Sequence, residues 1–151
     1  GVQPDVTIVD LQQAVHGTLH LLRPLADRSS VTITCLMSEG VTVRASEDDI
    51  YHIVFNLVEN AIKYNLPGGD VTVRVETRGE QSILSVADTG IGIDPDKREW
   101  VFERFAKVDP FKPGSGIGLY LCRLIVTRLG GEIRVCPEYR AGCCIDIVLP
   151  C

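Results

Sequence analysis

The stretch NLVENAIKYN, residues 56–65, is an apolar, helix-like segment that carries polar side chains at helical spacing. Asn56 and Asn60 are four residues apart, and Lys63 follows three residues later. On an α-helix, residues four apart differ by about 40° around the axis and residues seven apart by about 20°, so these side chains form one narrow stripe. An amide oxygen suits Mg²⁺, and an ammonium suits phosphate. The stripe therefore indicates a phosphate and magnesium site, with an amide pair that caps neighbouring loops as the alternative.

Length and composition predict one domain over residues 1–151. The chain has 151 residues and is 45% hydrophobic, which is enough for one well-buried core and too short for two. Its formal net charge is −5, and no Lys/Arg cluster stands out. This argues against a nucleic-acid partner, because a nucleic-acid groove must neutralise a run of phosphates.

The six cysteines are scattered through apolar segments and form no CxxC pair. This pattern argues against a zinc site or a secreted disulfide scaffold and favours reduced thiols in the cytoplasm. No apolar run reaches the roughly 18–20 residues of a membrane span, and the first residues lack the layout of a signal peptide. We expect no direct membrane contact in this segment. The chain starts at Gly1 without Met, which leaves room for a longer protein.

Hydrophobic patterns predict alternating helices and strands in two layers. A short strand leads into a helix with Leu11, Val15, Leu19 and Leu22 on one stripe. Residues 31–35 and 41–45 alternate with period two around a turn at 38–40 and are predicted to form a hairpin. Ser46 and Asp49 form a capping box for the helix that carries the stripe. Further strands are expected at 71–77, 82–88, 132–136 and 143–150, with a helix over 116–131 before the last two.

The segment between Gly90 and Gly118 is rich in Gly, Pro and charge. Loops of this length inside a compact domain are usually functional or disordered. We predict a lid at about residues 94–115, with a short helical piece near 98–105 and with Pro110 and Pro113 stiffening the chain.

The sequence DTGIGI, residues 88–93, ends the strand over 82–88. Strand parity puts Asp88 on the same face as Leu84 and Val86, where a carboxylate is costly unless a partner satisfies it. The exocyclic amine of adenine is such a partner, and Gly90 and Gly92 would allow close approach of the backbone. A simple turn at the end of a strand is the alternative.

The sequence GSGIGL, residues 114–119, opens the next helix with three alternate glycines. Free backbone N–H groups and the positive end of the helix dipole can face an anion there. The segment lacks the Lys-Ser/Thr of a P-loop and does not directly follow a strand, so neither a P-loop nor a dinucleotide fingerprint fits.

Taken in order, these motifs resemble the catalytic and ATP-binding domain of sensor histidine kinases, a group shared with gyrase, the mismatch-repair MutL proteins and a heat-shock chaperone. NLVENAIKY resembles the N box, DTGIGI the first glycine box, VFERF the F box and GSGIGL the second glycine box. The resemblance runs from about residue 7 to Pro150. It implies an α+β fold of the GHKL type: a mixed, mostly antiparallel sheet of about five strands covered on one face by three helices.

The resemblance also implies a site for ATP and Mg²⁺. It implies that Asn60 binds the metal, that Asn56 lines the triphosphate site, and that Lys63 and Lys107 contact phosphate. Tyr64 would pack near the adenine or ribose, and Asp88 would accept from the adenine amine. Phe102 and Phe105 would anchor the lid. The remaining implied contacts are Gly90 and Gly92 at the start of the lid, and Gly114, Ser115, Gly116, Ile117, Gly118 and Leu119 at the phosphates.

Two positions depart from the family pattern: Ser115 replaces a more usual Thr, which is a mild change, and Cys143 is the other. Relatives often place a Thr or Ser near the adenine where this chain has Cys143, whose parity with Ile145 and Ile147 faces it inward. A thiol is a weak hydrogen-bonding group, so we expect a water-mediated adenine contact to be lost.

The same stripe distinguishes a kinase from an ATPase. Gyrase-like relatives have a Glu general base four residues before the metal Asn, and Asn56 stands there in this chain. Glu59 lies about 100° from Asn60 around the helix and is a poor substitute, so we expect slow ATP hydrolysis. Phosphoryl transfer depends on positioning and charge neutralisation, and the acceptor can supply the nucleophile.

The three histidines, His16, His20 and His52, do not match the phosphoacceptor pattern. The expected function is therefore a protein histidine kinase whose acceptor histidine lies on a dimerisation domain absent from this chain, which in turn serves a response regulator. The expected location is the cytoplasm, either free or as the cytoplasmic part of a membrane-anchored bacterial sensor. A non-catalytic nucleotide-binding module and an anti-sigma-factor type of serine kinase remain as alternatives.

Overall fold

A computed structural model describes residues 5–112 and 114–151, so Pro113 and residues 1–4 lie outside the described residues. Its helices and strands are β1 (Thr7–Asp10), α1 (Leu11–Arg28), β2 (Thr32–Met37), β3 (Thr42–Ala45), α2 (Glu47–Lys63), β4 (Asp70–Arg78), β5 (Gln81–Asp88), the short 3₁₀ helices η1 (Pro95–Lys97) and η2 (Trp100–Phe102), α3 (Gly118–Arg128), β6 (Glu132–Val135) and β7 (Cys144–Pro150).

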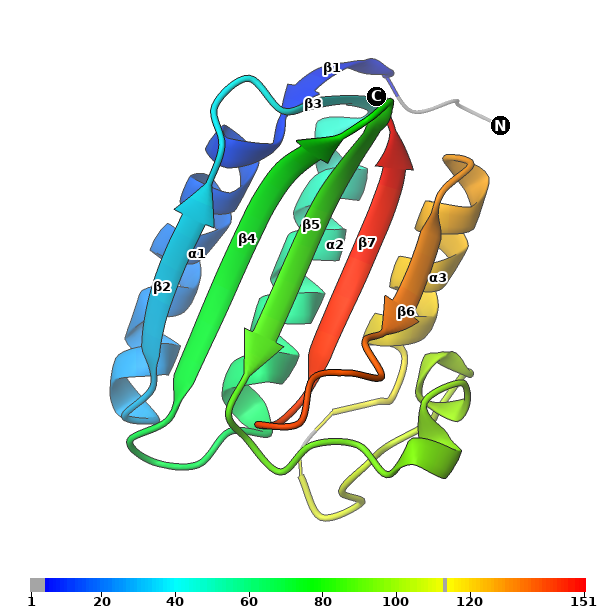
Figure 1. Cartoon of the computed structure of the whole chain (residues 1–151). Coiled ribbons are helices and arrows are strands. Elements are labelled where there is room, and N and C mark those ends of the chain that lie inside the picture. Colours follow the sequence, from blue (N-terminus) through cyan, green and yellow to red (C-terminus); the bar gives the residue numbers. More distant parts are fainter. Residues whose placement is uncertain (1–4, 113) are drawn as a thin grey trace.

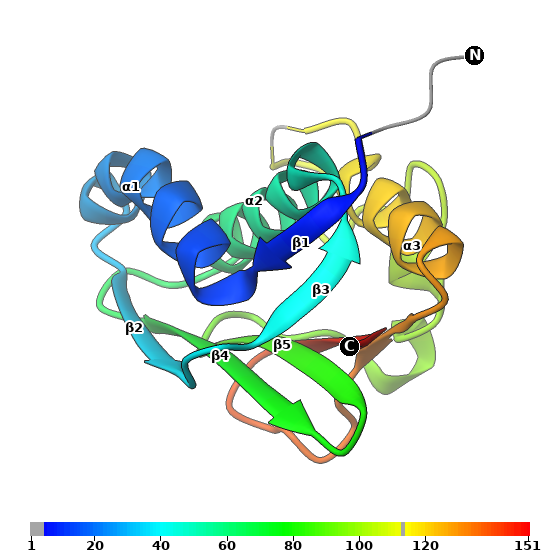
Figure 2. The ribbon, with the colours of Figure 1, turned by 90° about the horizontal axis from the view of Figure 1, so that it is seen from above.

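Within the described residues, five strands form one sheet in the order β2-β4-β5-β7-β6. β2 pairs with β4 in parallel, and every other neighbouring pair in this sheet is antiparallel. Helices α1, α2 and α3 lie on one face of the sheet, as Figures 1 and 2 show. The α+β class, the mixed sheet and the covering of one face by three helices are therefore confirmed.

The predicted hairpin between residues 31–35 and 41–45 is wrong. β2 continues into parallel pairing with β4, and Ser38 N–H donates to Val75 O at 2.8 Å. β3 instead pairs antiparallel with β1, from Thr7 opposite Ala45 to Asp10 opposite Thr42. The two form a short ribbon at the top of Figure 1. Alternation identifies a strand and its buried face, but two strands with the same pattern can each find another partner.

A side-chain cap stands at the start of each of the two long helices. The Asp10 side chain accepts from Gln13 N–H at 3.2 Å, and Ser46 Oγ accepts from Asp49 N–H at 3.0 Å. The predicted start of α2 is therefore confirmed. A side-chain oxygen at this position satisfies one of the N–H groups that the first helical turn leaves without a partner.

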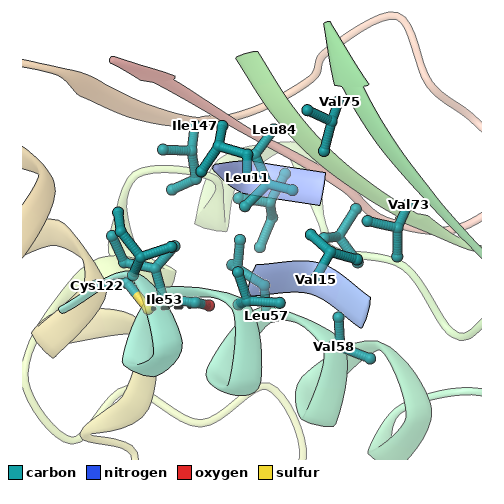
Figure 3. Close-up of a cluster of buried hydrophobic side chains, with 14 of the residues drawn as sticks. Leu11, Val15, Ile53, Leu57, Val58, Val73, Val75, Leu84, Cys122 and Ile147 are labelled. Atoms are coloured by element: carbon teal, nitrogen blue, oxygen red, sulfur yellow. Dashed lines mark hydrogen bonds between the residues drawn. The ribbon is translucent and has the colours of Figure 1, made fainter. Parts of the chain in front are cut away.

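The core lies between the sheet and the apolar faces of α1 and α2. Both predicted faces are buried, with Leu11, Val15, Leu19 and Leu22 on α1 and Ile50, Ile53, Val54, Leu57 and Ala61 on α2. Figure 3 shows α2 side chains packed toward Val73, Val75, Leu84 and Ile147 of the sheet. The Cys122 thiol of α3 donates to Ile53 O at 3.9 Å, which ties α3 to α2.

Between β5 and α3, the described residues form loops with two single 3₁₀ turns, η1 and η2. Helix α3 begins at Gly118, so the first two glycines of GSGIGL precede it and do not lie within its first turn. Phe102 is buried, whereas Phe105 is 59% exposed. The expected anchoring role therefore fits Phe102 and not Phe105. Within the described residues, no helix is both long enough and apolar enough to cross a membrane.

Candidate functional site

Two adjoining pockets lie where the carboxyl end of α2 meets the end of β5 and the start of α3. The first pocket is lined mainly by apolar side chains, and the second is lined mainly by polar groups. Asn60, Tyr64, Val108 and Leu119 line both. The apolar pocket is further lined by Leu57, Ala61, Val86, Asp88, Gly92, Ile93, Cys143 and Ile145. The polar pocket is further lined by Asn56, Glu59, Lys63, Val101, Ala106, Gly114, Ser115, Gly116 and Gly118.

Asp88 is the one carboxylate among the described residues that line the apolar pocket, and it is only 6% exposed. Its Oδ1 accepts from Gly90 N–H at 2.9 Å and from Cys143 N–H at 3.1 Å. Burial raises the pKa of this carboxyl, and the two backbone hydrogen bonds oppose that rise. Both bonds use Oδ1, which leaves Oδ2 free of these two bonds and able to accept from a ligand.

Gly142 and Tyr139 hold the backbone of Asp88 from the side of the loop before β7. The Tyr139 hydroxyl donates to Asp88 O at 2.7 Å. A Cβ at position 142 would meet Asp88 Oδ1 at 2.8 Å, so the close approach of this loop requires a glycine there. The loop thus fixes the carboxylate from outside the pocket.

The predicted stripe on α2 faces the polar pocket. Asn56, Asn60 and Lys63 all line it, and Asn60 also lines the apolar pocket. The Asn56 amide donates to His52 O at 2.7 Å, which directs its Oδ1 toward α3. A Cβ on Gly118 would lie 2.6 Å from that oxygen, so only glycine allows the helices to meet here.

Lys63 is the central cation of the polar pocket. Its ammonium lies 5.1 Å from the centre of the Tyr64 ring. Burial lowers the pKa of Lys63, the Glu59 carboxylate opposes that effect, and the charges of Lys107 and Lys112 lower the pKa further. The ammonium groups of Lys107 and Lys112 thus lie close enough to repel that of Lys63, and a bound polyanion would relieve that repulsion.

The glycine segment before α3 lines the polar pocket with Gly114, Ser115 and Gly116. Gly116 has φ of 75°, and its carbonyl accepts from Phe105 N–H at 2.9 Å. No side chain caps α3 at its N-cap, Ile117, among the described residues. The first N–H groups of α3 and its positive dipole end are therefore available to an anion.

The chain matches the family described as histidine kinase-, DNA gyrase B-, and HSP90-like ATPase over residues 45–151. The chain belongs to this family. It is 32% identical to the sensor-like histidine kinase SenX3 of Mycolicibacterium smegmatis over 97% of its own length and 39% of that protein. It also superposes on the mycobacterial sensor histidine kinase MprB with a TM-score of 0.85 and 32% identity, covering 97% of each chain. The resemblance to the ATP-binding domain of sensor histidine kinases is thus confirmed.

A second similar structure is full-length ShkA in complex with AMPPNP, with a TM-score of 0.87 and 27% identity. The alignment covers 99% of this chain and 32% of that one. The present chain therefore spans about a third of the length of such full-length members of the family.

Most residues that the resemblance implies at the ATP and Mg²⁺ site line the two pockets, and three do not. Gly90 lies behind the pocket, because a Cβ on it would meet the backbone Cα of Asn65 at 2.9 Å. Ile117 is the N-cap of α3 and lines neither pocket. Lys107 does not line them either, and its ammonium donates to Lys112 O at 2.7 Å.

Sequence reasoning discounted Glu59, which nevertheless lines the polar pocket beside Asn60. The pocket is wide enough to contact residues that lie 100° apart around the helix, whereas the sequence pattern predicted contact along one narrow stripe. Slow ATP hydrolysis stays a prediction. The apolar lining residues Leu57, Ala61, Val86 and Ile145 could not be separated from the core by their pattern alone, because they lie on the same faces as core residues.

Cys143 lines the apolar pocket next to Asp88. Burial is the main cause that raises the pKa of its thiol to about 12, and the charge of Asp88 adds to the rise. The side chain is therefore a neutral, weakly polar group at neutral pH.

Proposed function

We propose that this domain binds ATP and transfers its γ-phosphate to a histidine on a dimerisation domain outside this chain. The observation that carries the proposal is the pair of pockets joined at Asn60, with a buried carboxylate at the apolar end and Lys63 with glycine N–H groups at the polar end. Adenosine triphosphate has the same polarity, with a base at one end and charge at the other. The confirmed family and the AMPPNP complex of ShkA support this assignment.

Each end of the pocket pair has a proposed task. At the apolar end, Asp88 accepts from the adenine amine, Gly92 and Cys143 lie against the base, and Tyr64 packs beside the ribose. At the polar end, Lys63 and Asn56 hold the phosphates. The backbone of Gly114, Ser115, Gly116, Gly118 and Leu119 contributes N–H groups there. Gly90, Ile117 and Lys107 act indirectly in this arrangement: Gly90 and Ile117 shape the loops, and Lys107 adds positive charge.

Mg²⁺ fits the residues present. Asn60 offers one hard amide oxygen at the junction of the two pockets, and Glu59 lies beside it on the polar side. Mg²⁺ commonly takes one or two protein oxygens and completes its shell with water and phosphate oxygens. We therefore propose Asn60 as the protein ligand of the metal, which would neutralise charge on the phosphates when bound.

The acceptor histidine is proposed to come from elsewhere in the intact protein. His16, His20 and His52 are exposed, and none of them lines either pocket. We propose a dimerisation and phosphotransfer domain as the first partner and a response regulator as the second. We place the reaction in the cytoplasm, since the donor is ATP and the six cysteines are free thiols.

A phosphotransfer assay tests the proposal. The domain is joined to the upstream helices of its own protein, incubated with ATP labelled at the γ-phosphate, and analysed for acid-labile label. Label on a histidine, lost in the Asn60→Asp variant, is the expected result. Retention of nucleotide with no label anywhere would favour a regulatory module. Label on a serine of a partner protein would favour a serine kinase.

A further inference from the structure

A cluster of thiol and carboxylate groups lies on the outer face of the sheet, away from the helices. Cys136 follows β6 and lies opposite Cys144 of β7, and Cys136 N–H donates to Cys144 O at 2.8 Å. Asp146 lies two residues beyond Cys144 and so faces the same side. The two Sγ atoms and a carboxylate oxygen of Asp146 all lie within 4.8 Å of one another.

The sulfur–oxygen distance in this cluster matches an edge of a tetrahedral metal site, and the sulfur–sulfur distance is shorter than such an edge. Zn–S bonds of about 2.3 Å and Zn–O bonds of about 2.1 Å place two sulfurs about 3.8 Å apart and a sulfur and an oxygen about 3.6 Å apart. The observed Sγ–Sγ distance is 3.2 Å, and the distance from Cys144 Sγ to Asp146 Oδ1 is 3.7 Å. A disulfide requires about 2.05 Å between the sulfurs, which is a larger displacement than metal binding requires.

Neighbouring side chains already orient the carboxylate. Ser85 of β5 and Arg134 of β6 both stand opposite Asp146 in the sheet register. Ser85 Oγ donates to Asp146 Oδ1, and the Arg134 guanidinium lies 3.6 Å from Oδ2. Polar partners of this kind orient a metal ligand in known sites.

The charges of the cluster also balance around a divalent ion. Two thiolates and one carboxylate carry three negative charges, which a divalent ion and the Arg134 guanidinium would together offset.

The geometry points to a binding site for a thiophilic divalent ion of the zinc class, formed by Cys136, Cys144 and Asp146 with a fourth position open to water. Thiolate ligands select soft or borderline ions over Mg²⁺ and Ca²⁺. Three protein ligands with one open position is a known zinc arrangement. Cys136 and Asp146 are half-buried and not sealed, so an ion can reach the site from solvent. This site is separate from the pockets proposed to hold ATP and Mg²⁺.

Cobalt titration of the reduced chain tests the inference. The protein is treated with a phosphine reductant, stripped with a chelator and titrated with Co²⁺ alone. The expected result is one equivalent bound, with the absorption of a thiolate-to-cobalt transition and the visible bands of a tetrahedral site, both removed by Zn²⁺. A titration of the wild-type chain without these bands would overturn the inference, and so would a chain that forms a Cys136–Cys144 disulfide yet takes up no Co²⁺ after reduction.

Variants separate this site from the other thiols. Cys136→Ser and Cys144→Ser should each abolish the thiolate absorption, whereas the matched control Cys35→Ser, on β2, should leave it unchanged. Ser85→Ala keeps all three ligands and should weaken Co²⁺ binding about 10- to 100-fold, as expected for a residue that orients a ligand. Bands that persist at full strength in both Cys136→Ser and Cys144→Ser would exclude these thiols as ligands.

Discussion

Replacing Asp88 by Asn separates the binding role of this carboxylate from its cost to the fold. The amide has nearly the same shape, and its oxygen can keep both backbone hydrogen bonds, from Gly90 N–H at 2.9 Å and Cys143 N–H at 3.1 Å. Its NH₂ group then takes the place of Oδ2 at the pocket. The oxygen that would accept a hydrogen bond from the adenine amine is thereby replaced by an NH₂ donor, so two donors face each other.

The expected loss of affinity follows from that change. A hydrogen bond to a charged group contributes about 1.5–3 kcal/mol, so losing it should weaken binding of an ATP analogue about 10- to 150-fold. Binding of GTP should weaken less, because the guanine carbonyl meets a carboxylate in the wild type and an NH₂ group in the variant. The wild type should therefore prefer ATP, and Asp88→Asn should narrow that preference.

The stability of the folded domain should not fall with the nucleotide affinity in Asp88→Asn. Burial raises the pKa of Asp88 in the folded chain, so the folded state holds this proton more tightly than the unfolded state. The stabilising contribution is present below the ordinary carboxyl pKa of about 3.9 and is lost as pH rises through the raised value. At neutral pH the wild type carries this cost and the amide does not. Asp88→Asn should keep or raise the melting temperature and flatten the dependence of stability on pH in the acidic range.

Titration calorimetry with AMPPNP and its guanine counterpart, together with thermal unfolding at several pH values, measures all of these effects. Asp70→Asn is the matched control, because it removes the same charge from an exposed position on the neighbouring strand β4. An Asp88→Asn variant that binds AMPPNP within twofold of wild type would refute the proposed contact. A variant that melts several degrees lower at pH 7 would refute the assignment of a net burial cost.

Three further predictions follow from the geometry. Asn60→Asp should weaken Mg²⁺-dependent binding of AMPPNP about tenfold or more, because it places a second carboxylate beside the phosphates. The far-ultraviolet circular dichroism spectrum should stay unchanged. Equal calorimetric affinities of the variant and the wild type would contradict this prediction. Gly116→Ala should impair nucleotide binding, because φ at Gly116 is 75° and the new Cβ would meet the Phe105 backbone at 2.7 Å. The control Gly79→Ala, at a φ of 61° with open space around the new Cβ, should cost about 1–2 kcal/mol of stability and leave nucleotide binding unchanged. Gly17→Ala, inside α1 with nothing within 4 Å of the new Cβ, should raise unfolding free energy by up to about 1 kcal/mol in a denaturant melt, and a decrease would show an unrecognised constraint.

Local chemistry made much of this fold predictable from sequence. The Ser46 cap, the apolar face of α2 and the parity that buries Asp88 are each set by residues within a few positions of one another. Such patterns fix an element and the face that it buries, because both depend on backbone period. The family motifs then added the spatial order of the elements, which short-range patterns do not contain.

Pairing between distant segments was not predictable in the same way. Residues 41–45 are correctly predicted as a strand, but this strand pairs with β1 and not with β2. The partner could not be predicted, because period-two alternation does not specify which strand pairs with which. The same limit applies to the cysteines. The absence of a CxxC spacing argued against a metal site, yet strand pairing brings the sulfurs of Cys136 and Cys144, eight residues apart, to 3.2 Å.

The proposed nucleotide site and the thiol cluster share one stretch of backbone although they share no side chain. Cys143 and Cys144 are consecutive, so they face opposite sides of the sheet. The N–H of Cys143 holds the Asp88 carboxylate, while Cys144 stands opposite Cys136 on the outer face. An ion bound outside would therefore restrain the peptide that positions the acceptor inside. Because a restrained loop loses less entropy when a ligand orders it, we expect Zn²⁺ at the outer site to tighten AMPPNP binding, and equal calorimetric affinities with and without Zn²⁺ would contradict this coupling.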